Sequence, residues 1–276
     1  MKRVALLLIS LLLFPLIASA SFHKHLWPQW EVNNPLSKTL ISHEEWQTFL
    51  TRCVITNEEG IHLVDYPHLS KSDIALLKQY TQRLSLIPIS TYSRNEQLAF
   101  WINLYNALVV QIVADNYPIE TVQDVNISPG LFSVGPWGSN LITVANTQLS
   151  LDDIQNRIIR PLWNDPRTHY ALNDGTLGAA NLSKQAFQGD QIEAQLNQAA
   201  FHYINSLRGV QVIDGKLIAS KLYDWYLDDF GGTEAYLITH LSIYAKEILR
   251  QRLKTVKTVD TYMYNWHLNS TIPSTT

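Results

Sequence analysis

The chain has 276 residues and a formal charge of −3, with 46% apolar and 16% charged residues. This composition excludes a disordered chain, a collagen-like chain and a coiled coil, and it supplies enough apolar mass for a sizeable core. The near-balanced charge argues against a nucleic-acid binder, because such proteins rely on a surplus of Lys and Arg. A single cysteine excludes a disulfide scaffold and a cysteine-rich zinc site.

The first residues have the pattern of a secretory signal peptide. Lys2 and Arg3 precede an apolar run from Val4 to Ile17, and the small residues Ala18-Ser19-Ala20 follow it. The run is shorter than a helix that crosses a bilayer. We therefore expect residues 1–20 to be a cleaved signal peptide. The mature protein is expected to be exported, periplasmic or secreted, and not to span the membrane.

The remaining sequence predicts a helix-rich α+β fold in a single domain, with a long buried central helix and a small, mainly antiparallel sheet. Its expected parts are an N-terminal lead-in and helical segment at 21–92, a core at 93–255, and an aromatic strand and tail at 256–276. Helices are expected at 42–53, 72–84, 93–116, 150–160, 190–208, 220–226 and 233–253. Short strands are expected at 141–145, near 148, at 168–172, and in a hairpin that joins 210–213 to 216–219 through a type I′ turn.

The expected central helix at 93–116 has the clearest signals. Ser93 and Glu96 fit a capping box, in which each side chain satisfies a backbone donor of the other residue. Apolar residues then recur at helical spacing until Tyr117-Pro118 ends the pattern. Because further apolar residues occupy the other side, we expect other elements to enclose this helix.

Three polar residues on this helix need an explanation: Glu96, Asn103 and Asn106. A buried amide without a partner costs about 1–3 kcal/mol, so each side chain requires one. One interpretation is structural, with the side chains tying loops to the helix. The other is functional, with the same residues forming the floor of a ligand-binding cleft.

His169 is the second candidate. It begins the expected strand at 168–172 and precedes a glycine-containing loop, a placement typical of a general base. Asp165 and Asp174 are close enough in sequence to orient its ring. The alternative interpretation is a histidine that is hydrogen-bonded within the core.

We expect the helix and the histidine strand to meet at one cleft, on which Glu96, Asn103 and His169 converge. A buried helix has to place its polar side chains against protein partners or a solvated pocket. The rim of this cleft is expected to come from the loop that follows the strand: Asp174, Gly175 and Thr176.

No metal or cofactor is expected. The chain has no His-Glu-x-x-His motif, EF-hand, phosphate loop or Gly-x-Ser-x-Gly elbow. Helix capping and solvent exposure explain the adjacent aspartates at 152–153 and 228–229. Cys53 lies on the apolar face of an expected helix, so we interpret it as a small buried hydrophobe and not as a nucleophile.

Aromatic residues are abundant, with eight Trp and thirteen Tyr. Core packing explains most of them, although apolar walls with a few polar groups also describe small-ligand pockets. Those near expected loops or element ends are Tyr66, Trp137, Tyr170, Tyr223, Trp225 and Tyr226.

The run Ala99-Phe-Trp-Ile-Asn-Leu-Tyr-Asn-Ala107 resembles the signature helix of the domain of unknown function 547 family. Further blocks resemble the same family in the same order: 149–154, 159–161, 165–167, 169–172, 220–226, 229–231 and 264–269. The resemblance covers roughly residues 40 to 270 and implies no activity, substrate or cofactor. Many family members carry Cys-Gly-Ser-x-x-Cys-Pro after the histidine strand, whereas this chain has Asp174-Gly-Thr-Leu-Gly-Ala-Ala180.

A buried helix followed by a strand that begins with histidine is also similar to transglutaminase-like and papain-like folds, which place a catalytic cysteine at the helix start. This chain has Asn95-Glu96-Gln97 there. We therefore expect an exported, non-enzymatic or catalytically degenerate module that binds a small molecule or peptide of the cell envelope. The alternative is a hydrolase or transferase in which His169 works with Glu96 or Asp174. A structural assembly protein with an exposed aromatic patch is the third hypothesis.

Overall fold

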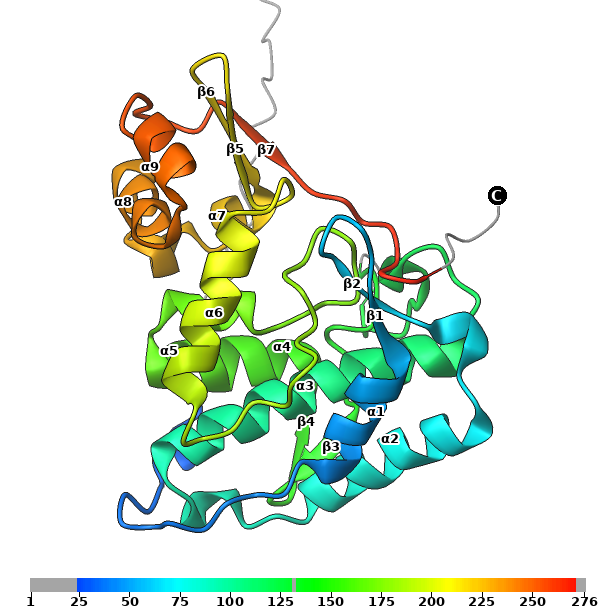
Figure 1. Ribbon diagram of the computed structural model, residues 1–276. Coiled ribbons are helices and arrows are strands. Elements are labelled where there is room, and N and C mark those ends of the chain that lie inside the picture. Colours follow the sequence, from blue (N-terminus) through cyan, green and yellow to red (C-terminus); the bar gives the residue numbers. More distant parts are fainter. Residues whose placement is uncertain (1–23, 131–132, 272–276) are drawn as a thin grey trace, which may run out of the picture.

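The computed structural model describes residues 24–130 and 133–271, so the expected signal peptide at 1–20 lies outside the described residues. The fold is helix-rich α+β around a long central helix, as predicted (Figure 1). The α-helices are α1 (Glu44–Cys53), α2 (Lys71–Ser85), α3 (Arg94–Asn116), α4 (Leu151–Asp153), α5 (Arg160–Trp163), α6 (Ile192–Ile204), α7 (Lys221–Trp225), α8 (Glu234–Tyr244) and α9 (Glu247–Leu253). The 3₁₀ helices are η1 (Pro28–Glu31), η2 (Tyr66–His68), η3 (Ile89–Thr91), η4 (Val122–Asp124), η6 (Pro166–Tyr170) and η7 (Leu227–Phe230), and η5 (Ile154–Ile159) is a π-helix. The strands are β1 (Val54–Thr56), β2 (His62–Val64), β3 (Ile142–Val144), β4 (Thr147–Leu149), β5 (Val210–Ile213), β6 (Lys216–Ser220) and β7 (Thr261–Met263).

Helix α3 forms the centre of the molecule, and every side chain from Glu96 to Val110 is buried. It is long and apolar enough to cross a membrane, but 89% of the relevant stretch is buried inside the protein, as in the core helix of a globular fold. Ser93 caps the helix through the Glu96 amide at 3.4 Å. The expected capping box is only half formed, because Glu96 Oε1 instead accepts the Ile41 amide at 2.7 Å.

The strands form three small sheets instead of one. The pairs β1–β2 and β3–β4 are antiparallel, and β7 adds a parallel strand to the antiparallel hairpin β5–β6. Asp214 and Gly215 join β5 to β6 with φ values of 49° and 74°, which is the type I′ turn that the sequence predicts.

Buried apolar side chains form two clusters. The larger surrounds α3 and includes residues of α1 and α2, while the smaller gathers Tyr170, Tyr203 and Tyr223 with residues of α6, α8 and the β5–β6 hairpin. In Figure 1, α8 and α9 lie beside this hairpin, on the opposite side of the molecule from α1 and α2.

The prediction of a strand at 168–172 is wrong, because Pro166–Tyr170 form the 3₁₀ helix η6. Asp165 starts the turn: its side-chain Oδ1 accepts the Arg167 amide at 2.9 Å, and its carbonyl accepts the Thr168 amide at 3.1 Å. Pro166 favours the first helical position because its ring fixes φ. Local side-chain bonds thus replace the expected strand.

The helix that begins after Ser150 continues through Pro161, where the sequence predicts its end. Proline has no amide N–H, which leaves the carbonyl four residues earlier without its helical donor. That carbonyl belongs to Arg157, and it accepts the Trp27 amide from the N-terminal lead-in at 3.2 Å. The lead-in therefore supplies the donor that Pro161 lacks, so the helix continues without an unpaired carbonyl.

The single helix expected at 233–253 is divided into α8 and α9. Asn205, the residue that follows α6, binds both sides of the break. Its Nδ2 donates to the Tyr244 carbonyl at 2.9 Å, and its Oδ1 accepts the Lys246 amide at 2.7 Å. A tertiary contact thus supplies the partners that a continuous helix would have provided.

After β7 the chain returns along the loop that follows η6. The Gly178 amide donates to the Asn265 carbonyl at 2.8 Å, and the Asn269 amide donates to the Gly175 carbonyl at 2.9 Å. This C-terminal tail therefore places Tyr264 and Trp266 next to a loop that lies far from them in sequence.

Candidate functional site

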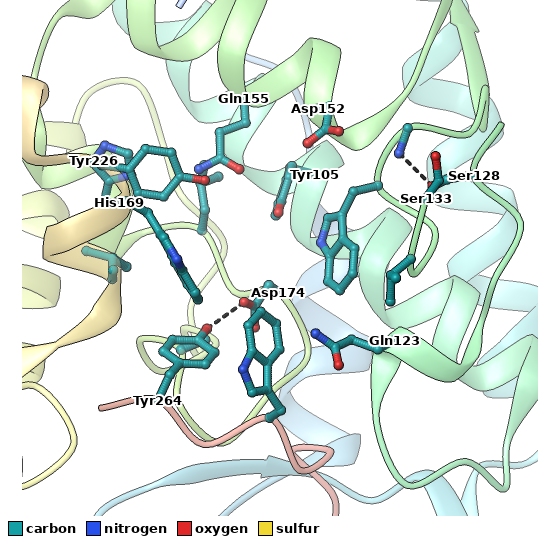
Figure 2. Close-up of a pocket in the computed structure, with 18 of the residues that line it drawn as sticks. Tyr105, Gln123, Ser128, Ser133, Asp152, Gln155, His169, Asp174, Tyr226 and Tyr264 are labelled. Carbon is teal, nitrogen blue, oxygen red and sulfur yellow. Dashed lines mark hydrogen bonds between the residues drawn. The ribbon is translucent and has the colours of Figure 1, made fainter. Parts of the chain in front are cut away.

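A cavity of about 500 Å³ lies between α3, residues 128–129 and 133–138, the helix that starts at α4, α7 and the C-terminal tail (Figure 2). Its walls are largely aromatic and include Tyr105, Trp137, Trp225, Tyr226, Tyr264 and Trp266. Its polar residues are Gln123, Ser128, Ser133, Asp152, Gln155, His169 and Asp174.

Tyr105 projects into the cavity from the central helix. Its side chain is almost completely buried, with 2% of the residue exposed, and none of the described residues forms a hydrogen bond with its hydroxyl. Figure 2 shows the residue between Asp152 and Asp174. Burial raises the pKa of Tyr105 well above its usual value, and the nearby Asp174, Tyr226 and Asp152 raise it further. The hydroxyl thus remains protonated and can both donate and accept a hydrogen bond.

Asp152 and Asp153 have different roles, although the sequence suggests capping and exposure for both. Asp153 completes a capping box with Ser150, accepting from its amide at 3.0 Å and from its hydroxyl at 2.7 Å. Asp152 instead lines the cavity, and no described residue donates a hydrogen bond to its carboxylate. Burial, followed by the negative charge of Asp153, raises the pKa of Asp152.

Asp174 lines the opposite part of the cavity and is held by its neighbours. Its Oδ2 accepts the Tyr264 hydroxyl at 2.5 Å, and its Oδ1 accepts the Thr176 hydroxyl at 2.6 Å and the Thr176 amide at 3.0 Å. Burial raises the pKa of Asp174, and these donors partly offset that rise. The other two expected rim residues do not line the cavity: Thr176 is fully buried, and Gly175 lies against Val109 of α3.

His169 forms part of the wall, and Asp229 fixes its orientation. Its Nε2 lies 2.8 Å from Asp229 Oδ2, which also accepts the Arg160 Nε at 2.5 Å. Lys24 lies 3.3 Å from the other oxygen. Burial favours a higher pKa for Asp229, but the hydrogen bonds from His169 and then Arg160, together with their charges, hold it well below its usual value. Burial lowers the pKa of His169, although its hydrogen bond to Asp229 opposes this shift.

These contacts determine which ring nitrogen of His169 carries the proton. Because the Asp229 carboxylate is ionised and can only accept, Nε2 is the donor and Nδ1 has the lone pair. Nδ1 is buried and has no hydrogen-bond partner among the described residues. The expected partners Asp165 and Asp174 do not orient the ring. Asp165 instead binds Arg167, whose Nη2 lies 2.5 Å from Asp165 Oδ2.

The polar residues of α3 tie loops to the helix, as the structural interpretation proposes. Asn103 accepts the Phe187 amide at 2.9 Å and donates to the Phe187 carbonyl at 2.8 Å. Asn106 donates to the Ala171 carbonyl at 2.9 Å and accepts the Asn173 amide at 2.9 Å.

The expected convergence of Glu96, Asn103 and His169 on one cleft is therefore not present. Glu96 binds the Ile41 amide, and neither Glu96, Asn103 nor Asn106 is among the residues that line the cavity. The amides of Asn103 and Asn106 and the Oε1 atom of Glu96 satisfy backbone groups of distant loops, which is a requirement of burial and not of ligand binding.

The sequence interpretation missed Tyr105 and Asp152 as residues of the site, together with the aromatic residues of the tail, Tyr264 and Trp266. One signal for Tyr105 was present: a hydroxyl on a helix that is apolar on nearly all sides needs a partner or a polar cavity. For Tyr264 and Trp266 no local signal exists, because only the return of the tail brings them to the cavity.

The remaining candidates for chemistry are a metal site and the lone thiol. No cluster of three or more His, Cys, Asp or Glu side chains suited to a metal ion occurs within residues 24–130 and 133–271. Cys53 is buried at the end of α1, and burial raises the pKa of its thiol to about 12.

Residues 89–204 match the family model described as "Protein of unknown function, DUF547". The matched segment includes α3 with Tyr105, and also Asp152, His169 and Asp174. The resembling blocks at 220–231 and 264–269 lie outside it. No curated protein and no solved structure matches the chain.

Proposed function

We propose that this DUF547 family protein binds a small molecule or a short peptide in the cavity beside α3 and does not transform it chemically. A volume of about 500 Å³ lies within the range of pockets for small ligands. The mainly aromatic walls and few polar groups are typical of such pockets. The observation that carries the proposal is the Tyr105 hydroxyl, which faces this space without a hydrogen-bond partner among the described residues.

The geometry of His169 favours binding over catalysis. A general base has to reach the proton that it removes, either directly or through one water molecule. In His169, Nε2 is bound to Asp229 and Nδ1 is buried. The hydrolase or transferase hypothesis retains one supporting observation, since His169 and Asp174 line the same cavity. Turnover of a bound compound would favour that hypothesis.

The proposed place of action is the cell envelope or the exterior of the cell. This part of the proposal rests on the basic and apolar pattern of residues 1–20. Detection of the mature protein in periplasmic or culture fractions, with a new N-terminus after residue 20, would support export. Retention of the full-length chain in the cytoplasm would contradict it.

The binding proposal can be tested by thermal-shift screening of envelope-derived peptides, glycans and metabolites. Any compound that stabilises the protein is then titrated against Tyr105→Phe. Loss of one hydrogen bond should weaken binding by about threefold to tenfold while the far-UV dichroism stays unchanged. Tyr236→Phe is the matched control, because Tyr236 is 64% exposed on α8 and away from the cavity. Equal effects of the two variants, or no stabilising compound of any class, would contradict the proposal.

A further inference from the structure

The charged groups of the cavity indicate what kind of ligand it accepts. Asp152 and Asp174 both line it, and none of its described lining residues is Lys or Arg. Arg160 and Lys24 bind Asp229, which holds His169, and Arg157, whose charge acts on Asp152, forms an ion pair with Asp153 at 2.9 Å. An anionic ligand would therefore meet two acidic groups without a basic side chain to offset them.

The two carboxyl groups differ in the number of hydrogen bonds that their oxygens accept. Asp174 accepts three hydrogen bonds, from Tyr264 and from the hydroxyl and amide of Thr176. Asp152 accepts none from the described residues, although it is partly buried. An ionised carboxylate is a hydrogen-bond acceptor only, so Asp152 lacks a donor that a ligand can supply. The nearby Tyr105 hydroxyl also has no hydrogen-bond partner among the described residues, so it can accept a hydrogen bond from a ligand.

The aromatic rings form a corner and not a flat platform. The ring centroids of Tyr264 and Trp266 are 4.8 Å apart with planes inclined at 59°, and those of Trp225 and Trp266 are 5.4 Å apart with planes inclined at 45°. Trp225 and Tyr264 are 4.9 Å apart, also at 59°. At these separations the three rings pack directly against one another, so together they form an apolar wall of the cavity.

Resting on the proposed binding function, we infer that the ligand carries a protonated primary amine, whose N–H groups donate to the Asp152 carboxylate and to the Tyr105 hydroxyl. The aromatic residues of the cavity provide an apolar wall for the carbon skeleton of the ligand. A primary ammonium suits these acceptors because it has three donors and no acceptor. A free small amine and the N-terminus of a peptide share this chemistry.

The test compares ligands that differ mainly in charge. Phenethylamine is paired with phenethyl alcohol, tri-alanine with N-acetyl-tri-alanine, and cellobiose serves as a neutral sugar. Binding is followed by quenching of tryptophan fluorescence, since Trp137, Trp225 and Trp266 line the cavity, and by thermal shift. We expect at least one charged member to bind about tenfold or more tightly than its neutral partner.

Two variants connect this preference to the proposed contacts. Asp152→Asn should remove most of the preference for the charged member while leaving the weak binding of its neutral partner unchanged. Asp228→Asn is the control, because it changes an exposed carboxylate outside the cavity. Tyr105→Phe should weaken binding of the amine by a smaller factor, and it provides an independent test if Asp152→Asn fails to fold.

The outcomes separate this inference from the binding function itself. Equal binding of both members of each pair, or binding of cellobiose alone, overturns the amine assignment and leaves the binding function intact. An amine preference that survives in Asp152→Asn also overturns the assignment. If none of these probes binds and the wider screen finds no stabilising compound, both proposals fail.

Discussion

The Tyr264 hydroxyl donates a hydrogen bond to Asp174 Oδ2 at 2.5 Å, although the two residues are 90 positions apart in the chain. The same hydroxyl lies 3.0 Å from Thr176 Oγ1. A tail residue thus fixes the carboxyl group of a loop in the core of the fold. The cavity wall is complete only when the tail lies against that loop.

Tyr264→Phe should destabilise the protein by about 1–2 kcal/mol, because the Asp174 carboxylate loses one of its donors. Loss of a donor to the ionised form should also raise the pKa of Asp174 further above its usual value. Urea denaturation at neutral pH measures the first effect, and NMR titration of the Asp174 carboxyl carbon measures the second. Tyr236→Phe is the control, and a stability loss of the same size there would contradict the assignment.

Gly178→Ala should displace the tail. A Cβ atom at this position would lie 2.8 Å from the Asn265 amide nitrogen and 2.9 Å from its carbonyl oxygen. These are backbone atoms, so the clash can be relieved only if the backbone of the tail moves. We expect lower stability, faster proteolysis of residues after β7 and altered fluorescence of Trp266.

Gly215→Ala is the comparison for this variant. It places a Cβ atom in open space, with a strained φ of 74° as its only cost. A similar change in Trp266 fluorescence in both variants would show that contact between Gly178 and the tail is not the cause.

Asn103→Asp should destabilise the protein by about 3 kcal/mol or more without acting on the cavity. The Phe187 carbonyl would lose its donor, and a carboxylate would be buried in a site that is 0% exposed. Thermal denaturation measures the loss. Asn140→Asp, at an exposed amide that binds Gln148, should be nearly neutral. A stable Asn103→Asp protein that no longer binds ligand would restore the functional interpretation of this residue.

Folding stability should fall as the pH decreases from about 6.5 to about 4. Burial, with a further contribution from Arg83, lowers the pKa of His43 from 6.5 to about 4. Between pH 6.5 and 4 the unfolded chain binds a proton at His43 that the folded protein does not bind. Protonation therefore favours the unfolded state, and the free energy of unfolding is highest above pH 6.5 and falls as the pH approaches 4. At 1.36 kcal/mol per pH unit, this residue contributes about 3 kcal/mol. Burial also lowers the pKa of His62, His169 and His240, which act in the same direction.

His43→Gln should flatten this dependence, whereas the exposed substitution His25→Gln should not. Chemical denaturation at a series of pH values measures both slopes. An unchanged slope in His43→Gln would show that the imidazole of His43 is not the titrating group.

The sequence alone predicts the elements whose signals are local. The apolar spacing and Ser93 cap of α3, and the Asp214-Gly215 turn of the β5–β6 hairpin, depend on neighbouring residues only, and the structure contains both. Burial of the α3 amides also follows from the sequence. Their role as ties to loops does not, because the partners Phe187 and Ala171 are distant in the chain.

The tertiary structure decides which polar groups face a cavity. Asp152 and Asp153 are neighbours of the same type, yet one lines the cavity and the other caps a helix, because successive side chains on a helix point in different directions. Likewise, Asp229 binds His169 from 60 positions away. Local patterns determine where α3 and the turn of the β5–β6 hairpin form. Contacts between segments far apart in the chain, such as the return of the C-terminal tail to Asp174, determine what the buried polar groups face.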